Sequence, residues 1–326
     1  MAAKQTLKPV YCIGGAAIDY KLKAQHVLTP ATSNPVEITI TFGGVARNVA
    51  ENLAYWMNDV NLQCVVGDDE NGRKLLEYMR QRHIKTEDCL ILKQQKTGQY
   101  HVVLNQDGEM YIALSDMKCY DNIDEHSFLS KWDNWTSQAF IFADTNLPAA
   151  LLQNLLKAAQ SRQARLCIDP VSVCKADRLP SNLEGVFLLK PNQEEAKALT
   201  GIEINCMRNC VSAGYKLLDR GVQNVVISLG TLGYVIINRQ MANYYQTIQL
   251  DDVKNVNGAG DAFMAGILYG ISLGEELDRA CEWGAAAAAF TVQSSQTVAQ
   301  GISASQLKAL INNQKMIKGY QHAQLF

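Results

Sequence analysis

Short apolar runs alternate along the chain with longer stretches whose apolar residues recur every three to four positions. The runs are bounded by turn residues, so we predict buried strands at residues 10–13, 63–66, 140–143, 165–168, 186–189 and 225–228. The periodic stretches predict helices at residues 45–56, 72–82, 148–161, 193–199 and 211–220. Because strands that alternate with helices form parallel sheets covered on both faces, the pattern predicts an α/β fold with a mostly parallel central sheet flanked by helices.

Two stretches depart from this alternation of predicted strands and helices. Residues 20–42 and 100–114 alternate polar and apolar side chains, which is typical of exposed strands, and residues 105–108, Asn-Gln-Asp-Gly, are a hairpin signal within the second stretch. We therefore expect a single domain over residues 1–326, with lid segments at about 20–42 and 97–117 that form a small β-sheet. Residues 258–310 read as almost entirely helical, and the small residues at 284–289 would let helix backbones approach closely.

Composition narrows the classes of partner. With 48% hydrophobic residues, the 326-residue chain can bury one large core. A net charge of -2 offers no basic surface for a nucleic acid polymer, so we expect a small ligand. No apolar run approaches the roughly 18 residues of a membrane helix, and the start MAAKQTLKPV lacks the apolar core of a signal peptide; we expect no membrane partner and a cytoplasmic location. The nine scattered cysteines read as reduced thiols, and the pair Cys206 and Cys210 as helix residues rather than zinc ligands.

Residues 255–266 are the most informative segment for chemistry. Gly258, Ala259 and Gly260 precede a helical pattern that starts at Asp261. Such a start leaves backbone N–H groups unpaired at the positive end of the helix dipole, which predicts an anion hole. An aspartate beside it can take a proton from an alcohol while the N–H groups stabilise a phosphoryl group. The segment alone leaves a second interpretation open, an ordinary helix start with an acid in its first turn.

The same segment resembles the second signature of the ribokinase-like (PfkB) carbohydrate kinases. Asp19, after the first predicted strand, stands where that family places a carboxylate on sugar hydroxyls. Gly43, Gly44 and Asn48 resemble the first signature, in which two glycines let the backbone approach the sugar and the asparagine offers a donor and an acceptor. The resemblance covers essentially the whole chain. It implies that Asp261 is the catalytic base and that the other four residues bind the acceptor.

Two further elements resemble the parts of this family that bind ATP. Residues 190–195, Lys-Pro-Asn-Gln-Glu-Glu, resemble an element whose carboxylate orders Mg²⁺ and its waters, which assigns Asn192 and Glu195 to the metal. Residues 228–233 resemble a strand-end loop that receives the nucleotide. The resemblance thus implies Mg²⁺ with ATP, and the ATP-binding residues would be Lys190, Asn192, Ser228, Gly230 and Gly233.

The triplet at residues 255–257, Asn-Val-Asn, departs from the Asp-Thr-Thr that the family often has there. The change removes a carboxylate near the place where many members bind a monovalent cation. The resemblance therefore leaves dependence on potassium open.

Several short motifs resemble the branch of the family that phosphorylates pseudouridine. They lie at residues 33–35, 43–54, 115–117 and 169–172. On this resemblance the γ-phosphate of ATP passes to the ribose 5′-hydroxyl of pseudouridine. Asn34, Asp116 and Asn146 are then candidates to bind the sugar and the uracil edges, because a buried base needs paired hydrogen bonds. The alternative for these three is that they are solvent-facing loop residues.

Two alternative functions stay open. The first is a kinase of the same family that acts on another nucleoside or on a free sugar, such as ribose or a ketohexose. The second is a non-catalytic sensor that binds a sugar or nucleoside. Asp261, the glycines before it and Glu195 together favour an enzyme, because a sensor needs the pocket but not the base. Many relatives pair subunits through the lid, so a homodimer is compatible with the resemblance.

Two rival motifs are incomplete. Residues 67–74 have the glycine spacing of a P-loop, but Lys74 neither follows a glycine nor precedes Ser or Thr, and three consecutive acids would repel phosphate. The first predicted strand ends in Gly14 and Gly15 without the G-x-G-x-x-G pattern of nicotinamide dehydrogenases. A phosphotransferase is therefore the function that the sequence supports best.

Overall fold

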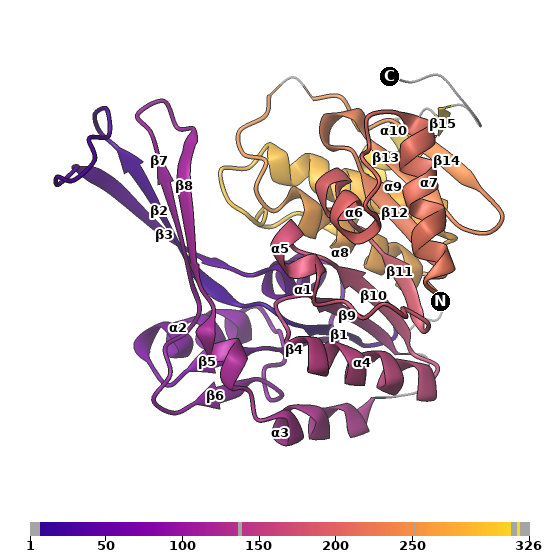
Figure 1. Cartoon of the computed structure of the whole chain (residues 1–326), viewed down its shortest axis with the longest axis horizontal. Helices are drawn as coiled ribbons and strands as arrows, with labels where there is room; N and C mark the ends of the chain where they lie inside the picture. Colours follow the sequence, from indigo (N-terminus) through magenta and orange to yellow (C-terminus); the bar gives the residue numbers. More distant parts are fainter. Residues whose placement is uncertain (1–6, 136–138, 251, 314–317, 320–326) are drawn as a thin grey trace.

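The computed structural model describes residues 7–135, 139–250, 252–313 and 318–319. Within these residues a nine-stranded sheet forms the centre of the molecule (Figure 1). Its spatial order is β15 (Lys318–Gly319), β14 (Ala242–Tyr245), β13 (Tyr234–Ile237), β12 (Asn224–Ser228), β11 (Val186–Leu189), β10 (Arg165–Asp169), β9 (Phe140–Asp144), β1 (Val10–Ile13) and β4 (Val60–Gln63). The strands from β12 to β4 pair in parallel, and those from β12 to β15 pair antiparallel. The predicted α/β fold with a mostly parallel sheet is confirmed.

Helices cover both faces of this sheet, because successive strand residues point to opposite sides. In β9, Phe140 and Phe142 belong to one apolar core, while Ile141 and Ala143 belong to the other. The first core includes α1 (Val45–Ala54), α2 (Glu70–Gln81), α8 (Ala259–Ser272), α9 (Leu277–Val292) and α10 (Ala304–Asn313). The second includes α3 (Glu125–Leu129), α4 (Ala149–Ser161), α6 (Gln193–Thr200) and α7 (Met207–Asp219).

The remaining helical turns are short. They are α5 (Val173–Ala176) and the 3₁₀ turns Lys118–Asn122, Ser130–Asn134 and Gly230–Leu232. Of all the helices in the described ranges, none combines the length and the apolar character needed to cross a membrane.

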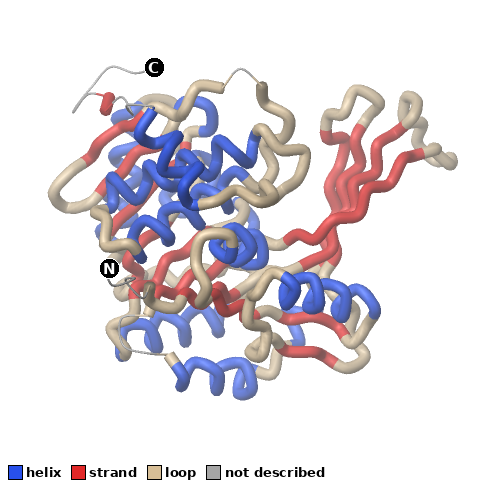
Figure 2. The backbone as a smooth tube through the Cα atoms, turned by 180° about the vertical axis from the view of Figure 1, so that it is seen from behind, coloured by secondary structure: helices blue, strands red, loops and turns tan. Residues whose placement is uncertain are grey.

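A second sheet of four strands, called the lid sheet below, projects from one side of the molecule (Figures 1 and 2). Its order is β3 (Val36–Gly43), β2 (Ala17–Ala24), β7 (Gln99–Leu104) and β8 (Met110–Asp116). The predicted turn closes the β7–β8 hairpin, where Gly108 has a φ of 89° and its N–H donates to the carbonyl oxygen of Asn105 at 3.1 Å. The small sheet that the alternating pattern predicts is therefore present.

The lid sheet has two chemically different faces. Paired residues of an antiparallel ladder share a face, and β2 pairs with β3 so that Lys21 lies opposite Thr39 on a polar inner face. The next pair along these strands, Tyr20 and Ile40, lies on the outer face. Apolar side chains of that outer face are exposed, among them Ile40 at 60% and Leu114 at 54%. At the base of the outer face Tyr20 and Phe42 pack against α2, and further out this face carries exposed apolar groups.

Two predicted elements differ from the structure. The predicted strand at residues 63–66 is two strands, because β4 ends at Gln63 on the central sheet and β5 (Val65–Gly67) pairs instead with β6 (Leu90–Leu92). Because the apolar residues continue without a break, the sequence does not show that the chain passes from one sheet to another here. Residues 258–310, which were predicted to be almost entirely helical, form α8, α9 and the start of α10, but a loop at residues 293–303 separates α9 from α10.

Small residues do bring α8 and α9 together. A Cβ added to Gly266 of α8 would lie 2.6 Å from the Cα atom of Gly284 in α9, which is closer than real atoms approach. The two helices can pack this tightly only because both positions are glycine. This contact fixes the direction of α8, whose first turn faces the site described next.

Candidate active site

Parallel strands gather polar residues at one edge of the central sheet. β9 and β10 end there with Asp144 and Asp169, and Lys190 follows the last residue of β11. Helices α1 and α8 begin at the same edge, where the Asn48 side chain donates to Oδ2 of Asp261 at 2.6 Å. The carboxyl edge of an open α/β sheet is the usual place for a ligand site.

Asp261 lies in the first turn of α8, where several neighbouring groups act on the pKa of its carboxyl group. Burial raises its pKa to about 7, and the nearby negative charge of Asp169 acts in the same direction. The hydrogen bond from Asn48 and the positive charge of Lys190 oppose this rise. The carboxylate is therefore ionised above about pH 7 and becomes protonated below it. A group with such a pKa can accept a proton at neutral pH.

The start of α8 leaves donors free for an anion. Gly258 precedes the helix with a φ of 81°, and no side chain caps this end. Within the described part of the chain the backbone N–H groups of Gly258, Gly260 and Asp261 have no acceptor, while that of Ala259 donates to a carbonyl oxygen at 3.4 Å. The Lys190 ammonium lies 3.7 Å from the point where Gly260 would carry a Cβ. Backbone donors and a cation thus converge, which is the arrangement that binds phosphate groups.

Lys190 is held by a partner that the sequence analysis did not select. Its ammonium lies 2.8 Å from Oδ2 of Asp169, and both side chains are less than 10% exposed, at 5% and 8%. Burial would lower the pKa of Lys190, but the attraction of Asp169 leaves it raised, so the cation persists. Asp169 could have been found as the acid that ends a predicted strand. The same signal marks Asp144, which ends β9.

Asn192 and Glu195 form the capping box of α6. The Asn192 backbone N–H donates to Oε2 of Glu195 at 2.8 Å, and the Glu195 N–H donates to Oδ1 of Asn192 at 2.9 Å. Burial raises the pKa of Glu195 to about 7, and the charge of Asp169 adds to the rise. The Glu195 carboxylate suits a hard divalent cation such as Mg²⁺. Among the described residues no group of three or more acidic, His or Cys side chains could hold a metal ion, so water and phosphate oxygens would supply the other ligands. These residues could therefore hold the ion, directly or through its waters.

The loop after β12 lies beside this capping box. The Ser228 N–H donates to the carbonyl oxygen of Pro191 at 3.0 Å. Gly230 has a φ of 61° with no atom within 4 Å of a Cβ placed on it, so its surroundings are open. At Gly233, with a φ of 120°, a Cβ would lie 2.0 Å from the carbonyl oxygen of Tyr245. The structure therefore brings Ser228 next to Asn192 and leaves open space at the tip of the loop.

The predicted acceptor residues lie between the lid sheet and the starts of α1 and α8. Burial raises the pKa of Asp19 to about 6, against the opposing charges of Arg47 and Lys21. A Cβ on Gly43 would lie 2.1 Å from an Asp19 carboxylate oxygen, and a Cβ on Gly44 would lie 2.4 Å from the carbonyl oxygen of Gly15. Both glycines are therefore required by close approach, to Asp19 and to the Gly15 backbone respectively. Their approach to a sugar, which the resemblance implies, stays a prediction.

A cavity of about 240 Å³ opens between these groups. Its walls are Asp19, Tyr20, Lys21, Thr39, Thr41, Asn48, Tyr100, Val102, Met110, Asn257, Gly258, Ser295, Gln296 and Thr297. A second cavity of about 570 Å³ shares several of these residues and continues along β3. The cavity therefore joins the inner face of the lid sheet, Gly258 of the predicted anion hole and the loop at residues 293–303. Asp261 does not line it but bonds to Asn48, which does. Sequence reasoning missed that loop, because only the folded chain brings it to the site.

Three predicted base contacts lie elsewhere. The Asn34 side chain accepts from the Thr29 N–H at 2.8 Å, within the β2–β3 loop, so the structure does not bring it to the cavity. Asp116 pairs with Gln99 at the end of β8, on the opposite face from the one that carries Asp19. Asn146 is buried near the strand ends, and its amide donates to Asp144 at 2.9 Å. None of these three lines the cavity beside Asp261.

Asp144 organises the loop after β1. Its Oδ2 accepts from the N–H groups of Gly15 and Ala46, both at 2.8 Å. Burial raises the pKa of this carboxyl group, and the backbone donors oppose the rise. Asp144 therefore fixes the start of α1, and with it the position of Asn48.

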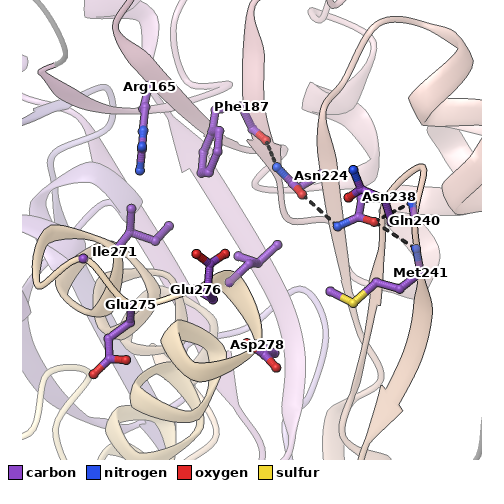
Figure 3. A pocket seen from close by; sticks show the side chains of 12 residues that line it. Arg165, Phe187, Asn224, Asn238, Gln240, Met241, Ile271, Glu275, Glu276 and Asp278 are labelled. Carbon is purple, nitrogen blue, oxygen red and sulfur yellow. Dashed lines mark hydrogen bonds between the residues drawn. The ribbon is translucent and has the colours of Figure 1, made fainter.

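A different cavity of about 560 Å³ lies at the opposite, amino-terminal edge of the sheet (Figure 3). Arg165 and Asn224, the first residues of β10 and β12, line it together with the turn between α8 and α9. Its amide groups already bond to one another, since the Asn224 amide donates to the carbonyl oxygen of Phe187 and accepts from Asn238. This cavity contains none of the predicted site residues. The predicted site residues Asp19, Asn48 and Gly258 line the smaller cavity instead.

The model of the pfkB family carbohydrate kinases matches residues 8–303. Pseudouridine kinase of Escherichia coli (strain K12) is 32% identical over 259 residues, which cover 79% of this chain and 82% of that protein. Ribokinase of Mus musculus is 29% identical over 266 residues, with 80% of each chain covered. The structure of Arabidopsis thaliana ribokinase complexed with ribose and ATP has a TM-score of 0.83 at 19% identity, covering 94% of this chain and 99% of that one. A putative sugar kinase from Clostridium perfringens has a TM-score of 0.81 at 25% identity, covering 97% and 99%.

Proposed function

Because the chain belongs to the pfkB family of carbohydrate kinases, which are phosphotransferases acting on hydroxyl groups, we propose that it transfers the γ-phosphate of ATP to the 5′-hydroxyl of pseudouridine. The observation that carries the proposal is the pairing of Asp261 with the free N–H groups at the start of α8. A base and an anion hole within one helical turn are what phosphoryl transfer to an alcohol requires.

In this proposal each residue of the site has a separate role in phosphoryl transfer. Asp261 takes the proton of the attacking hydroxyl, and Asn48 orients the carboxylate through its hydrogen bond. The N–H groups of Gly258 and Gly260, with the Lys190 ammonium, stabilise the negative oxygens of the transferring group. Asn192 and Glu195 hold Mg²⁺, which supplies further neutralisation of the phosphate charge when it is bound. The capping box keeps these two side chains in place.

The acceptor lies in the 240 Å³ cavity in this proposal. Asp19 accepts hydrogen bonds from ribose hydroxyls, at the position where Gly43 leaves room for its carboxylate. The base lies against the inner face of the lid sheet, where Lys21 and Thr39 offer polar groups and Tyr100 an aromatic ring. These residues replace Asn34 and Asp116 as candidates for reading the uracil edges, because they line the cavity. The pseudouridine motifs and the 32% identity to the Escherichia coli enzyme support this substrate over a free sugar.

The acceptor is tested by measuring ATP consumption with Mg²⁺ on pseudouridine, uridine, adenosine, ribose and fructose. We expect kcat/KM on pseudouridine to exceed that on uridine by at least about tenfold. The C-linked uracil presents an additional N–H group, and a site that accepts a hydrogen bond from this group discriminates against a base that lacks it. The Asp261→Asn protein, assayed in parallel, controls for contaminating ATPase.

Other outcomes of this panel separate the alternatives. Turnover on ribose or fructose alone would keep the kinase mechanism and discard the base contacts on the lid sheet. Calorimetric binding of a nucleoside without turnover on any acceptor would favour the sensor.

We further propose that residues 1–326 act as one catalytic domain with the lid sheet as its closing element. Closure would exclude water, so that the substrate hydroxyl rather than water accepts the phosphoryl group. The polar inner face and the cavity between it and α8 support this role.

The outer face of the lid sheet is suited to a second copy of the chain. Its exposed Ile38, Ile40, Ile112 and Leu114 form an apolar surface, which favours burial against a partner. We expect a homodimer in sedimentation equilibrium, and Ile40→Lys should shift it toward the monomer because a buried lysine charge opposes association. Tyr215→Lys, on the distant α7 and also exposed, is the matched control. A wild-type protein that stays monomeric at high concentration would contradict the dimer.

A further inference from the structure

A buried arginine contacts Asn48, the residue that bonds to the candidate base. Arg47 of α1 is 2% exposed, and one guanidinium nitrogen donates to the carbonyl oxygen of Phe42 at 2.6 Å, where β3 ends. The same guanidinium donates to Oδ1 of Asn48 and pairs with Glu51 one helical turn further on. Two guanidinium nitrogens thus contact three acceptors, while the buried Nε has no hydrogen-bond partner among the described residues.

Side chains in and just after α2 bind Glu51 and hold it in place. It is 1% exposed and accepts from the Tyr78 hydroxyl at 2.8 Å and from Nε of Arg82 at 2.7 Å. Gln300, in the loop at residues 293–303, also donates to it at 3.2 Å. A buried ion pair by itself adds little net stability. The pair between Arg47 and Glu51 does have a geometric consequence, because it holds the Arg47 guanidinium against the Asn48 side chain.

The orientation of the Asn48 amide depends on this contact. The oxygen and nitrogen ends of an asparagine amide have nearly the same shape, so hydrogen-bond partners decide which way it points. Arg47 can only donate, and it therefore selects the oxygen end. The amide nitrogen is left facing Asp261, 2.6 Å from its carboxylate. A reversed amide would point its oxygen at the carboxylate and repel it.

We propose that Arg47 is a positioning residue for phosphoryl transfer: by holding Oδ1 of Asn48, it turns the amide N–H toward Asp261 and keeps that carboxylate in its proton-accepting form. This inference deepens the function proposed above and rests on it. Arg47 reaches Asp261 only through Asn48, since its guanidinium bonds to Phe42, Asn48 and Glu51 and not to Asp261. Its charge also lowers the pKa of Asp19, so the test below follows the Asp261 carboxyl group itself.

The charges around Asp261 give the direction of the effect. Burial, Asp169 on β10 and Asp144 on β9 raise the pKa of Asp261, whereas the Asn48 hydrogen bond and Lys190 lower it. Loss of the hydrogen bond from Asn48 removes one of the two effects that lower the pKa of Asp261. The pKa then rises above its value of about 7, so less of the carboxylate is ionised at neutral pH and proton acceptance slows.

The test follows the Asp261 carboxyl group directly by ¹³C NMR of full-length protein labelled at the aspartate carboxyl carbons. The resonance is assigned by its disappearance in Asp261→Asn. The principal variant is the double substitution Arg47→Gln with Glu51→Gln, which removes both buried charges together and avoids an unpaired one. Arg47→Lys keeps the charge opposite Glu51 but has a single ammonium in place of the planar fork, which gives a second variant should the first not fold. Arg82→Gln is the matched control, because it also removes an arginine from Glu51 but leaves the Asn48 contact.

We expect the Asp261 titration to move upward by about one pH unit in the Arg47 variants and to stay in place in Arg82→Gln. The rate of phosphoryl transfer should fall roughly tenfold at pH 6 and recover above pH 8.5, because the base ionises again at high pH. An unchanged titration in a folded Arg47 variant, or an equal shift in Arg82→Gln, would overturn the inference. A wild-type protein without turnover on any acceptor would overturn the proposed function instead, and the NMR titration would still decide whether Arg47 sets the state of Asp261.

Discussion

Asp261→Asn is expected to lower kcat by roughly 10² or more while leaving acceptor binding nearly unchanged. The amide has the shape of the carboxylate and can still contact Asn48, 2.6 Å away, but it cannot take the proton of the attacking hydroxyl. Because this loss affects the transition state rather than the bound substrate, KM should change little. Steady-state kinetics and calorimetric titration of the acceptor measure the two quantities separately.

Asp107→Asn is the control for this substitution. Asp107 is an exposed acid in the β7–β8 turn of the lid sheet, so its neutralisation should leave kcat close to the wild-type value. Nearly normal turnover in Asp261→Asn would remove Asp261 from the mechanism and leave the second interpretation, an ordinary acid in the first turn of α8.

Gly258→Ala should reduce kcat by about 10² through the anion hole. Its φ of 81° is unfavourable for any residue with a Cβ, at a cost of roughly 1–2 kcal/mol, and the new Cβ would lie 2.0 Å from the carbonyl oxygen of Thr297. The backbone must shift to relieve this contact, and the free N–H groups at the start of α8 move with it. Displacing one preorganised donor of this kind typically costs 10²–10³ in turnover.

The other end of the same helix provides a matched control. Gly274, which follows α8, also has a left-handed φ of 86°, but no atom lies within 4 Å of a Cβ placed there. Gly274→Ala should therefore lower the melting temperature by a few degrees with nearly normal turnover. If Gly258→Ala loses no more activity than Gly274→Ala, the start of α8 does not serve as an anion hole.

The fold could be predicted because its signals are local. Apolar runs such as residues 140–143 become strands in almost the predicted positions, since burial on both faces requires continuous apolar residues. The run at residues 63–66 was misread, because an apolar pattern does not say which sheet a strand joins. The loop between α9 and α10 was missed for a similar reason, since its residues contact Gly258 and Glu51 only in the folded chain.

The sequence by itself determined three features: the α/β class, the presence of a small projecting sheet, and the helix start at Gly258 to Asp261. Strand periodicity, hairpin turns and helix starts all depend on residues that are neighbours along the chain. Only the tertiary structure decided which polar groups meet. It brought Asp169 to Lys190 and Arg82 to Glu51, and it placed Asn34 within the β2–β3 loop, away from the cavity. The reason is physical: a hydrogen bond or a pKa shift depends on distance and burial between side chains that are far apart in sequence, as Asn48 and Asp261 are.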